Sequence, residues 1–146
     1  MKYLLMQVMA LGLTLSVHAQ KAAVFTVEGK AIKGYDPVSF FTDGLAQKGL
    51  DSLHCEWNHA IWLFATAENR DSFKKAPEKY APQYGGYCAY GAADGHKAPT
   101  ETDTWSIVDG KLYFNYNKKV RQYWEKDRGN LIKKADANWP AIKDRE

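Results

Sequence analysis

The chain has 146 residues, of which 20 are Lys or Arg and 17 are Asp or Glu, so its formal net charge is +3. This length predicts a single domain that is large enough to bury a core. The weak positive charge does not favour a nucleic-acid partner, because the basic residues of segment 118–134 alternate with apolar residues at helical spacing, as on a solvated helix face. We find no internal sequence repeat and no linker that would separate two domains.

Residues 1–19 have the pattern of a signal peptide. The start is basic, residues 4–17 are mostly apolar but too short to span a bilayer comfortably, and Val17 and Ala19 offer the small side chains that a signal peptidase reads. We expect cleavage after Ala19, which leaves residues 20–146 as one domain in the periplasm or outside the cell, with no membrane association. An uncleaved membrane anchor is the alternative reading.

The first half of this domain predicts a strand, a short helix and a hairpin. Residues 23–27 form the strand, and Asp36 is the N-cap of a short helix that begins at the following proline. The hairpin covers residues 53–64 and turns at Asn58 and His59. Its register pairs Trp57 with Ala60, Cys55 with Trp62 and Leu53 with Phe64, and all six side chains share one face.

Two helices and a second hairpin follow. Thr66 caps a helix that runs to about Lys75, and a shorter helix covers residues 87–93. Asp109-Gly110 lies between two alternating runs and favours a type I′ turn. The resulting hairpin places on one face the side chains of Trp105, Ile107, Leu112 and Phe114.

The sequence pattern from Asn117 to Pro140 predicts a helical segment. Asn117 is its N-cap, Gly129 interrupts it and Pro140 ends it. Because hairpins and helices occur in separate runs, the predicted class is α+β. We expect a small antiparallel sheet, built from β-hairpins and packed against several short helices and a C-terminal helical segment.

Residues 80–90 hold four tyrosines, two adjacent glycines and Cys88. Pro82 stiffens the approach to the glycines, so we expect Gly85 or Gly86 to take a backbone conformation that is unfavourable for a residue with a Cβ. The tyrosines have two readings: they fill a core under the glycine loop, or they line a cleft for a small, flat or sugar-like ligand. The candidate ligand wall consists of Tyr35, Tyr84, Tyr87 and Tyr90.

Several segments together form an ordered set: Gly-Tyr-Asp-Pro-Val at 34–38, Phe-Ala-Thr-Ala-Glu-Asn-Arg-Asp-Ser-Phe at 64–73, Pro-Glu-Lys-Tyr at 77–80 and Gln-Tyr-Gly-Gly-Tyr-Cys-Ala-Tyr at 83–90. This set resembles the YHS domain family, and within it an exported single-domain bacterial branch. Two later segments, 108–113 and 135–140, also resemble that branch, so the resemblance covers nearly all of the mature chain.

The resemblance implies a YHS-like fold and a role in handling heavy metals through cysteine thiolates. The family's cysteine positions correspond here to Ser39, Ala65 and Asn69. A hydroxyl, a methyl group and an amide cannot replace three thiolates as ligands of a soft metal. The resemblance therefore supports the fold and argues against the family's thiolate site.

A transition-metal ion in this chain would need other ligands, and the candidates are Cys88, His96 and Asp94. The chain has two cysteines, Cys55 and Cys88. Three states of this pair stay open: a disulfide, two buried thiols, or a metal-binding or reactive role for Cys88.

The expected function is non-enzymatic binding of a metal ion or another ligand. The alternative is a small organic ligand held by the tyrosine-rich loop, and the third option is an enzyme with Cys88 as nucleophile. The chain contains no GxSxG motif, no HExxH motif and no phosphate-binding glycine loop, and we assign no catalytic residue. Beyond a small ligand or a metal ion, the sequence names no cofactor and no protein partner.

Overall fold

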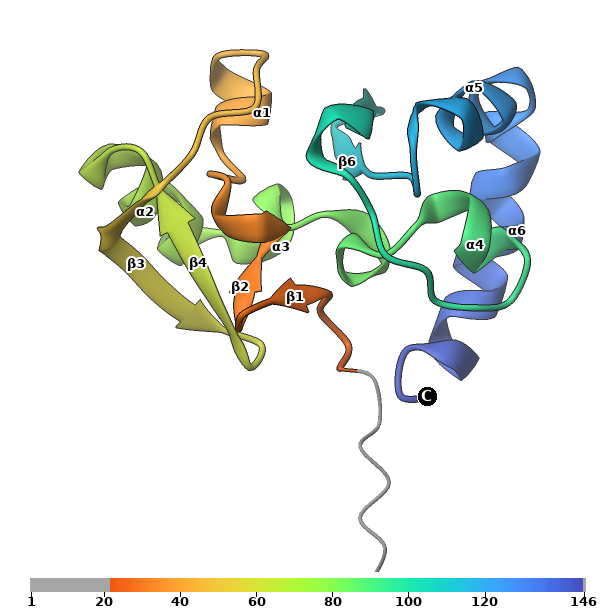
Figure 1. The fold of residues 1–146 in the computed structure, drawn as a ribbon, viewed down its shortest axis with the longest axis horizontal. Coiled ribbons are helices and arrows are strands. Elements are labelled where there is room, and N and C mark those ends of the chain that lie inside the picture. Colours follow the sequence, from red (N-terminus) through yellow and green to blue (C-terminus); the bar gives the residue numbers. More distant parts are fainter. Residues whose placement is uncertain (1–21, 146) are drawn as a thin grey trace, which may run out of the picture.

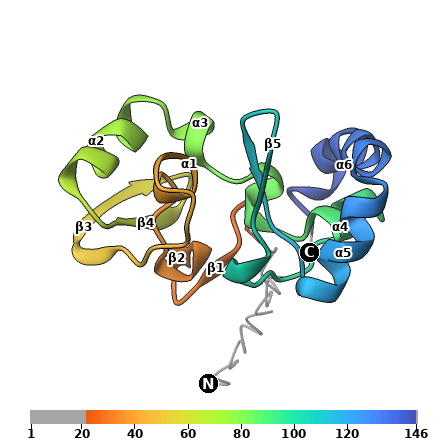
Figure 2. The ribbon, with the colours of Figure 1, turned by 90° about the horizontal axis from the view of Figure 1, so that it is seen from above.

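The computed structural model describes residues 22–145, which form an α+β fold. The predicted signal peptide and its cleavage site lie outside these residues. No helix in the described part of the chain is long and apolar enough to cross a membrane. Figures 1 and 2 show two lobes side by side, with the second hairpin between them.

The first lobe is built on a four-stranded sheet with strand order β1-β2-β4-β3. The sheet is antiparallel except where β2 runs parallel to β4. Three short helices and a 3-10 turn complete the lobe (Figure 1). Its elements are β1 (Thr26–Val27), β2 (Lys30–Ala31), η1 (Ile32–Gly34), α1 (Ser39–Thr42), β3 (Leu50–Trp57), β4 (Ala60–Phe64), α2 (Ala67–Lys75) and α3 (Pro77–Tyr80).

The second lobe is mainly helical, and α4 packs against the long α6. A two-stranded hairpin, β5 and β6, separates this helical part from the first lobe (Figure 2). Its elements are η2 (Gln83–Gly86), α4 (Ala89–Ala93), η3 (Thr102–Thr104), β5 (Ser106–Val108), β6 (Lys111–Tyr113), α5 (Lys118–Lys126) and α6 (Arg128–Ile142).

Each lobe has its own apolar core, and β6 contributes to both. Leu112 and, just beyond the strand, Phe114 pack into the core under the sheet. Tyr113, which points to the opposite face, packs with Trp124 and Ala135 of the helical core. Because successive side chains of a strand alternate between faces, one short hairpin joins the two lobes into a single unit.

The second hairpin turn and two of the predicted caps are confirmed. Asp109 and Gly110 have φ angles of 50° and 72°, and Ile107 faces Leu112 as expected. The Thr66 hydroxyl accepts a hydrogen bond from the Asn69 N–H at 3.1 Å, as an N-cap does. The Asn117 side chain caps α5 in the same way, through the N–H of Val120 at 2.9 Å. The first short helix begins at Ser39 with Val38 as its N-cap, and not at Pro37, although Asp36 still accepts the N–H groups of Val38 and Ser39.

The first hairpin differs from the prediction at its open end. Trp57 faces Ala60 and Cys55 faces Trp62 as predicted, but Phe64 faces Leu50 and not Leu53. An irregularity between residues 50 and 54 shifts the register, as a β-bulge does, so the simple two-residue count fails there.

The predicted strand over residues 23–27 is reduced to Thr26–Val27. The residues before it bond to the second lobe instead, because the Phe25 N–H donates to the Gly85 carbonyl at 2.8 Å. This contact brings the start of the described chain over the glycine loop.

The C-terminal helix also differs from the prediction in two places. The interruption lies at Asp127, with φ −140°, and not at Gly129. Pro140 lies inside α6, which continues to the buried Ile142. Proline removes one N–H donor of the helix, but burial of Ile142 in the helical core carries the chain through one more half turn.

The two lobes repeat one local plan, although the sequence shows no repeat. In each lobe a turn with three consecutive positive φ angles ends in a Gly-Tyr pair, at residues 32–35 and 84–87. A buried side chain then caps a short helix, which is followed by a hairpin and a second capped helix. The buried caps are Asp36, which accepts the Val38 N–H at 2.8 Å, and Cys88, which accepts the Gly91 N–H at 3.4 Å.

Candidate functional site

The glycine loop of residues 83–86 lies where the two lobes and the start of the described chain meet. Tyr84, Gly85 and Gly86 have φ angles of 55°, 60° and 83°, so the predicted unusual glycine conformation is confirmed. A Cβ placed on Gly85 would lie 1.8 Å from the carbonyl oxygen of Ala23. Glycine is therefore needed here for its backbone angle and for the close approach of Ala23.

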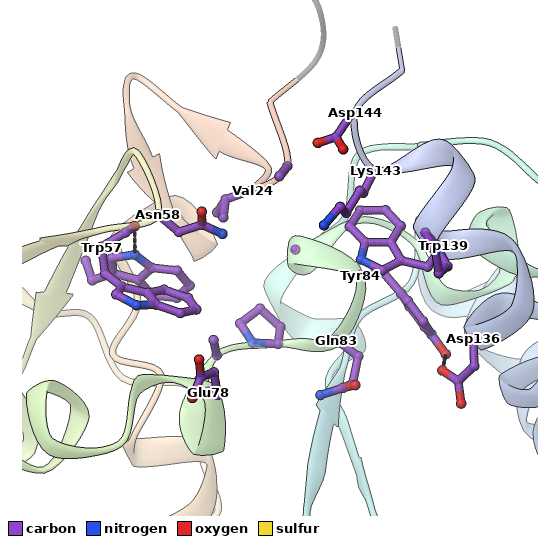
Figure 3. Close-up of a pocket in the computed structure, with 16 residues that line it drawn as sticks. Val24, Trp57, Asn58, Glu78, Gln83, Tyr84, Asp136, Trp139, Lys143 and Asp144 are labelled. Atoms are coloured by element: carbon purple, nitrogen blue, oxygen red, sulfur yellow. Dashed lines mark hydrogen bonds between the residues drawn. The ribbon is translucent and has the colours of Figure 1, made fainter.

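Beside this loop a cleft of about 470 Å³ opens between the lobes. One wall comes from the β3–β4 turn and α3, and the other from the C-terminal half of α6 and the residues after it (Figure 3). The floor is the segment 81–85, and Ala23 and Val24 close the upper side. The cleft thus uses segments that are more than 100 residues apart in the sequence.

Aromatic rings form much of both walls. On the first side Trp57 packs edge to face against the buried Trp62, with ring centroids 5.7 Å apart, and the Trp62 Nε1–H donates to the Trp57 carbonyl at 2.9 Å. On the opposite side Trp139 packs against Tyr84 at 5.9 Å. Because each ring is held by a second ring or a hydrogen bond, the aromatic surface is formed before any ligand binds.

The Tyr84 hydroxyl is fixed by a carboxylate. It donates a hydrogen bond of 2.8 Å to Asp136 Oδ1 on α6. Burial raises the pKa of Tyr84 well above its usual value, and the neighbouring carboxylate raises it further. The phenol therefore stays protonated at neutral pH and ties the floor of the cleft to α6.

Polar side chains complete the lining. Asn58 and Glu78 lie on the first wall, Gln83 on the floor, and Lys143 and Asp144 on the second wall. In Figure 3 the Asn58 amide and the Lys143 ammonium point toward one another across the open space. Among the described residues that line the cleft there is no Cys, His or Ser.

The four tyrosines that the sequence suggests as a ligand wall do not share one surface. Tyr84 lines the cleft, whereas Tyr87 lines a separate hollow of about 340 Å³ and donates to the Ala22 carbonyl at 2.7 Å. Tyr35 packs against the core of the first lobe, and Tyr90 is exposed on α4. Sequence reasoning missed Trp57 and the α6 residues, because no local pattern marks side chains that meet only through lobe packing.

The predicted metal ligand Cys88 is a buried structural residue. Its Sγ accepts N–H groups from Gly91 at 3.4 Å and Tyr116 at 3.3 Å, and its S–H donates to Asn115 Oδ1 at 3.6 Å. Burial raises the pKa of the thiol, and the side chain is only 2% exposed. Such a thiol is a poor nucleophile and has no approach for a substrate.

The other two predicted ligands lie elsewhere. Asp94 and His96 form an exposed pair, with Nδ1 3.6 Å from Oδ2. Within residues 22–145 no three His, Cys, Asp or Glu side chains lie close enough to hold a metal ion, so Cys88, His96 and Asp94 do not assemble. Cys55 is half-buried on β3 and Cys88 is in the other lobe, and both are free thiols.

The positions that correspond to the family's cysteines meet around the buried carboxylate of Asp36. Its Oδ1 accepts the N–H of Val38 at 2.8 Å and of Ser39 at 3.4 Å. Its Oδ2 accepts the N–H of Ala65 and the side-chain amide of Asn69, both at 2.8 Å. This network of hydrogen bonds joins α1, the end of β4 and α2.

Comparison of the chain with protein-family models, curated proteins and solved structures finds no match. The cleft offers aromatic walls, side-chain amides and charges of both signs. Asp36 and Cys88 are buried, and their hydrogen bonds stabilise the fold.

Proposed function

We propose that this protein is an exported, YHS-like binding protein that holds a small organic molecule in the cleft between its lobes. The observation that carries the proposal is the preformed aromatic cleft beside the glycine loop. Its volume of about 470 Å³ is in the range of small-molecule sites, which combine apolar walls with a few polar groups.

Four polar side chains of the cleft are available to a ligand. Within the described chain, the side chains of Asn58, Gln83, Glu78 and Lys143 make no hydrogen bond or ion pair with another residue. Asn58, Glu78 and Lys143 are exposed and Gln83 is partly buried, so these groups are open to an incoming molecule.

A metal-binding role has less support. The thiolate positions of the resembled family hold Ser39, Ala65 and Asn69, which together surround Asp36. We infer that this branch keeps the family fold and has replaced the metal centre with hydrogen bonds. The ligand site then belongs to the cleft, which lies at the turn of the β3–β4 hairpin, whereas Asp36 binds Ala65 at its open end.

Native mass spectrometry and metal analysis of protein purified from the periplasm test the proposal. We expect a chain that begins at Gln20, carries an organic molecule and contains no stoichiometric metal. Trp139→Ala and Gln83→Trp, which remove a wall and fill the floor, should lose the molecule. Tyr123→Ala is the matched control, because Tyr123 is an exposed aromatic residue of α5 outside the cleft.

Two results would overturn the proposal. A stoichiometric transition metal that is lost on His96→Ala or Cys88→Ser would favour the metal-binding function. An organic molecule that stays bound in both cleft variants, while their melting temperatures match that of the parent, would place the binding site elsewhere.

A further inference from the structure

We infer that the ligand of this cleft is amphoteric: a small molecule with an ammonium group, a carboxylate group and an apolar body, as in a free amino acid or a short peptide. This inference rests on the proposed function and adds the chemical class of the ligand. It follows from the signs and positions of the charges around the aromatic walls.

Glu78 and Lys143 lie on facing walls of the cleft and are not paired with one another. Glu78 lies on α3, on the side of Trp57, and Lys143 extends from the end of α6 beside the Trp139 ring (Figure 3). Neither forms an ion pair with another residue of segment 22–145. A ligand with an ammonium toward Glu78 and a carboxylate toward Lys143 would complement both walls at once.

A ligand with a single charge fits less well. An anion beside Lys143 leaves Glu78 without a counterion, and a cation beside Glu78 leaves Lys143 without one. Asp136, another carboxylate of the lining, is already bonded to the Tyr84 hydroxyl at 2.8 Å. Complementary charges at a binding site contribute to selectivity.

Asn58 adds a second polar contact opposite Lys143. It lies in the β3–β4 turn, where Asn58 and His59 have φ angles of 51° and 60°. Asparagine tolerates this left-handed region better than most residues, so the turn holds its amide at the mouth of the cleft. An amide and an ammonium on facing walls offer donors from two directions to one carboxylate.

The apolar body of the ligand has a defined surface. Trp57, Trp139 and Pro82 present flat apolar faces around the floor. Aromatic rings attract one another beyond the effect of area burial, which favours an aromatic ligand side chain.

Hydrogen bonds from Lys97 fix the segment that carries Lys143. The buried ammonium of Lys97, only 6% exposed, donates to the carbonyls of Lys143 and Arg145, the latter at 2.9 Å. It also donates to the carbonyl of Ala22 at 3.4 Å, next to the residues that close the upper side. Both chain segments at the rim are therefore fixed before the ligand binds, which lowers the entropy lost on binding.

Three probes of one shape test the charge requirement in the chain of residues 20–146. L-Phenylalanine carries both charges, phenethylamine only the ammonium and 3-phenylpropanoate only the carboxylate. Quenching of tryptophan fluorescence and calorimetry measure their affinities, and the dipeptide Gly-Phe distinguishes a peptide from a free amino acid as the natural source. We expect phenylalanine or the dipeptide to bind at least tenfold more tightly than either probe with one charge.

Two variants assign the charges to residues. Lys143→Met should lower the affinity for phenylalanine toward that for phenethylamine, and Glu78→Gln should lower it toward that for 3-phenylpropanoate. Lys133→Met on α6 and Glu68→Gln on α2 are controls of the same charge that do not line the cleft, and they should change nothing.

Equal binding of the three probes, or no binding of any amphoteric probe, overturns the amphoteric class. The proposed function stands in that case if the purified protein still loses its organic molecule in Trp139→Ala and Gln83→Trp. Loss of selectivity in the control variants would also overturn the assignment, because the charge would then act through the whole protein and not through the cleft.

Discussion

Gly85→Ala tests the central packing feature of the fold, the passage of Ala23 over the glycine loop. Gly85 has a φ of 60°, and an added Cβ would meet the Ala23 carbonyl oxygen at 1.8 Å. The nearest tolerable contact for a Cβ is more than 3 Å, so the chain before β1 must move away. That movement breaks the hydrogen bond from the Phe25 N–H to the Gly85 carbonyl, which is 2.8 Å long.

The expected loss of stability has two parts. A left-handed backbone costs a residue with a Cβ about 1–2 kcal/mol. Loss of the Phe25 hydrogen bond adds about 0.5–1.5 kcal/mol, and displaced contacts of Val24 in the first core add to it. We therefore expect Gly85→Ala to lower the free energy of unfolding by roughly 2–4 kcal/mol.

Gly44→Ala is the matched control. Gly44 has a φ of 64°, close to that of Gly85, but no atom lies within 4 Å of the position of its Cβ. This control should lose only the backbone part, about 1–2 kcal/mol. Urea unfolding followed by tryptophan fluorescence measures both variants, and equal losses in the two would refute the close approach of Ala23 to Gly85.

Three further predictions concern the buried polar groups. Asp36→Ala should lower the free energy of unfolding, measured in urea, by about 3 kcal/mol or more, because it leaves several buried donors without an acceptor. A loss below about 1 kcal/mol would show that the Asp36 network does not stabilise the fold. The free energy of unfolding should fall as the pH rises above about 10, because burial raises the pKa of Tyr84 in the folded state and the unfolded chain therefore releases this proton first. Tyr84→Phe should make that fall shallower. An unchanged slope in this variant would contradict the raised pKa of Tyr84. Alkylation of the native protein without reductant should label Cys55 faster than Cys88, and both after denaturation, whereas no labelling after denaturation would reveal a disulfide.

Much of the local structure could be read from the sequence because local chemistry determines it. A threonine or asparagine side chain before a helix binds the N–H of the third helical residue, as Thr66 and Asn117 do. Asp109-Gly110 adopts the positive φ angles that its hairpin needs. The unusual backbone of Gly85 and Gly86 was also predictable, since a stiff proline and two crowded tyrosines surround them.

Other features depend on contacts between distant segments, and local patterns misjudged them. Pro140 did not end α6, because burial of Ile142 outweighs one lost hydrogen bond. The pairing of Phe64 shifted from Leu53 to Leu50 through an irregularity that no residue pattern marks. Cys88 became a helix cap, although its chemistry alone left three roles open.

Local sequence patterns were enough to predict the α+β class, the hairpin turns and the caps of α2 and α5. Which aromatic and charged side chains share a surface depends on how the lobes pack. Trp57 and Trp139 are 82 positions apart, and they face one cleft because β6 joins both cores and Lys97 holds the chain ends at its rim. Trp57 and Trp139 are only partly buried, so no burial pattern selects them in the sequence, and their meeting is set by the packing of the lobes.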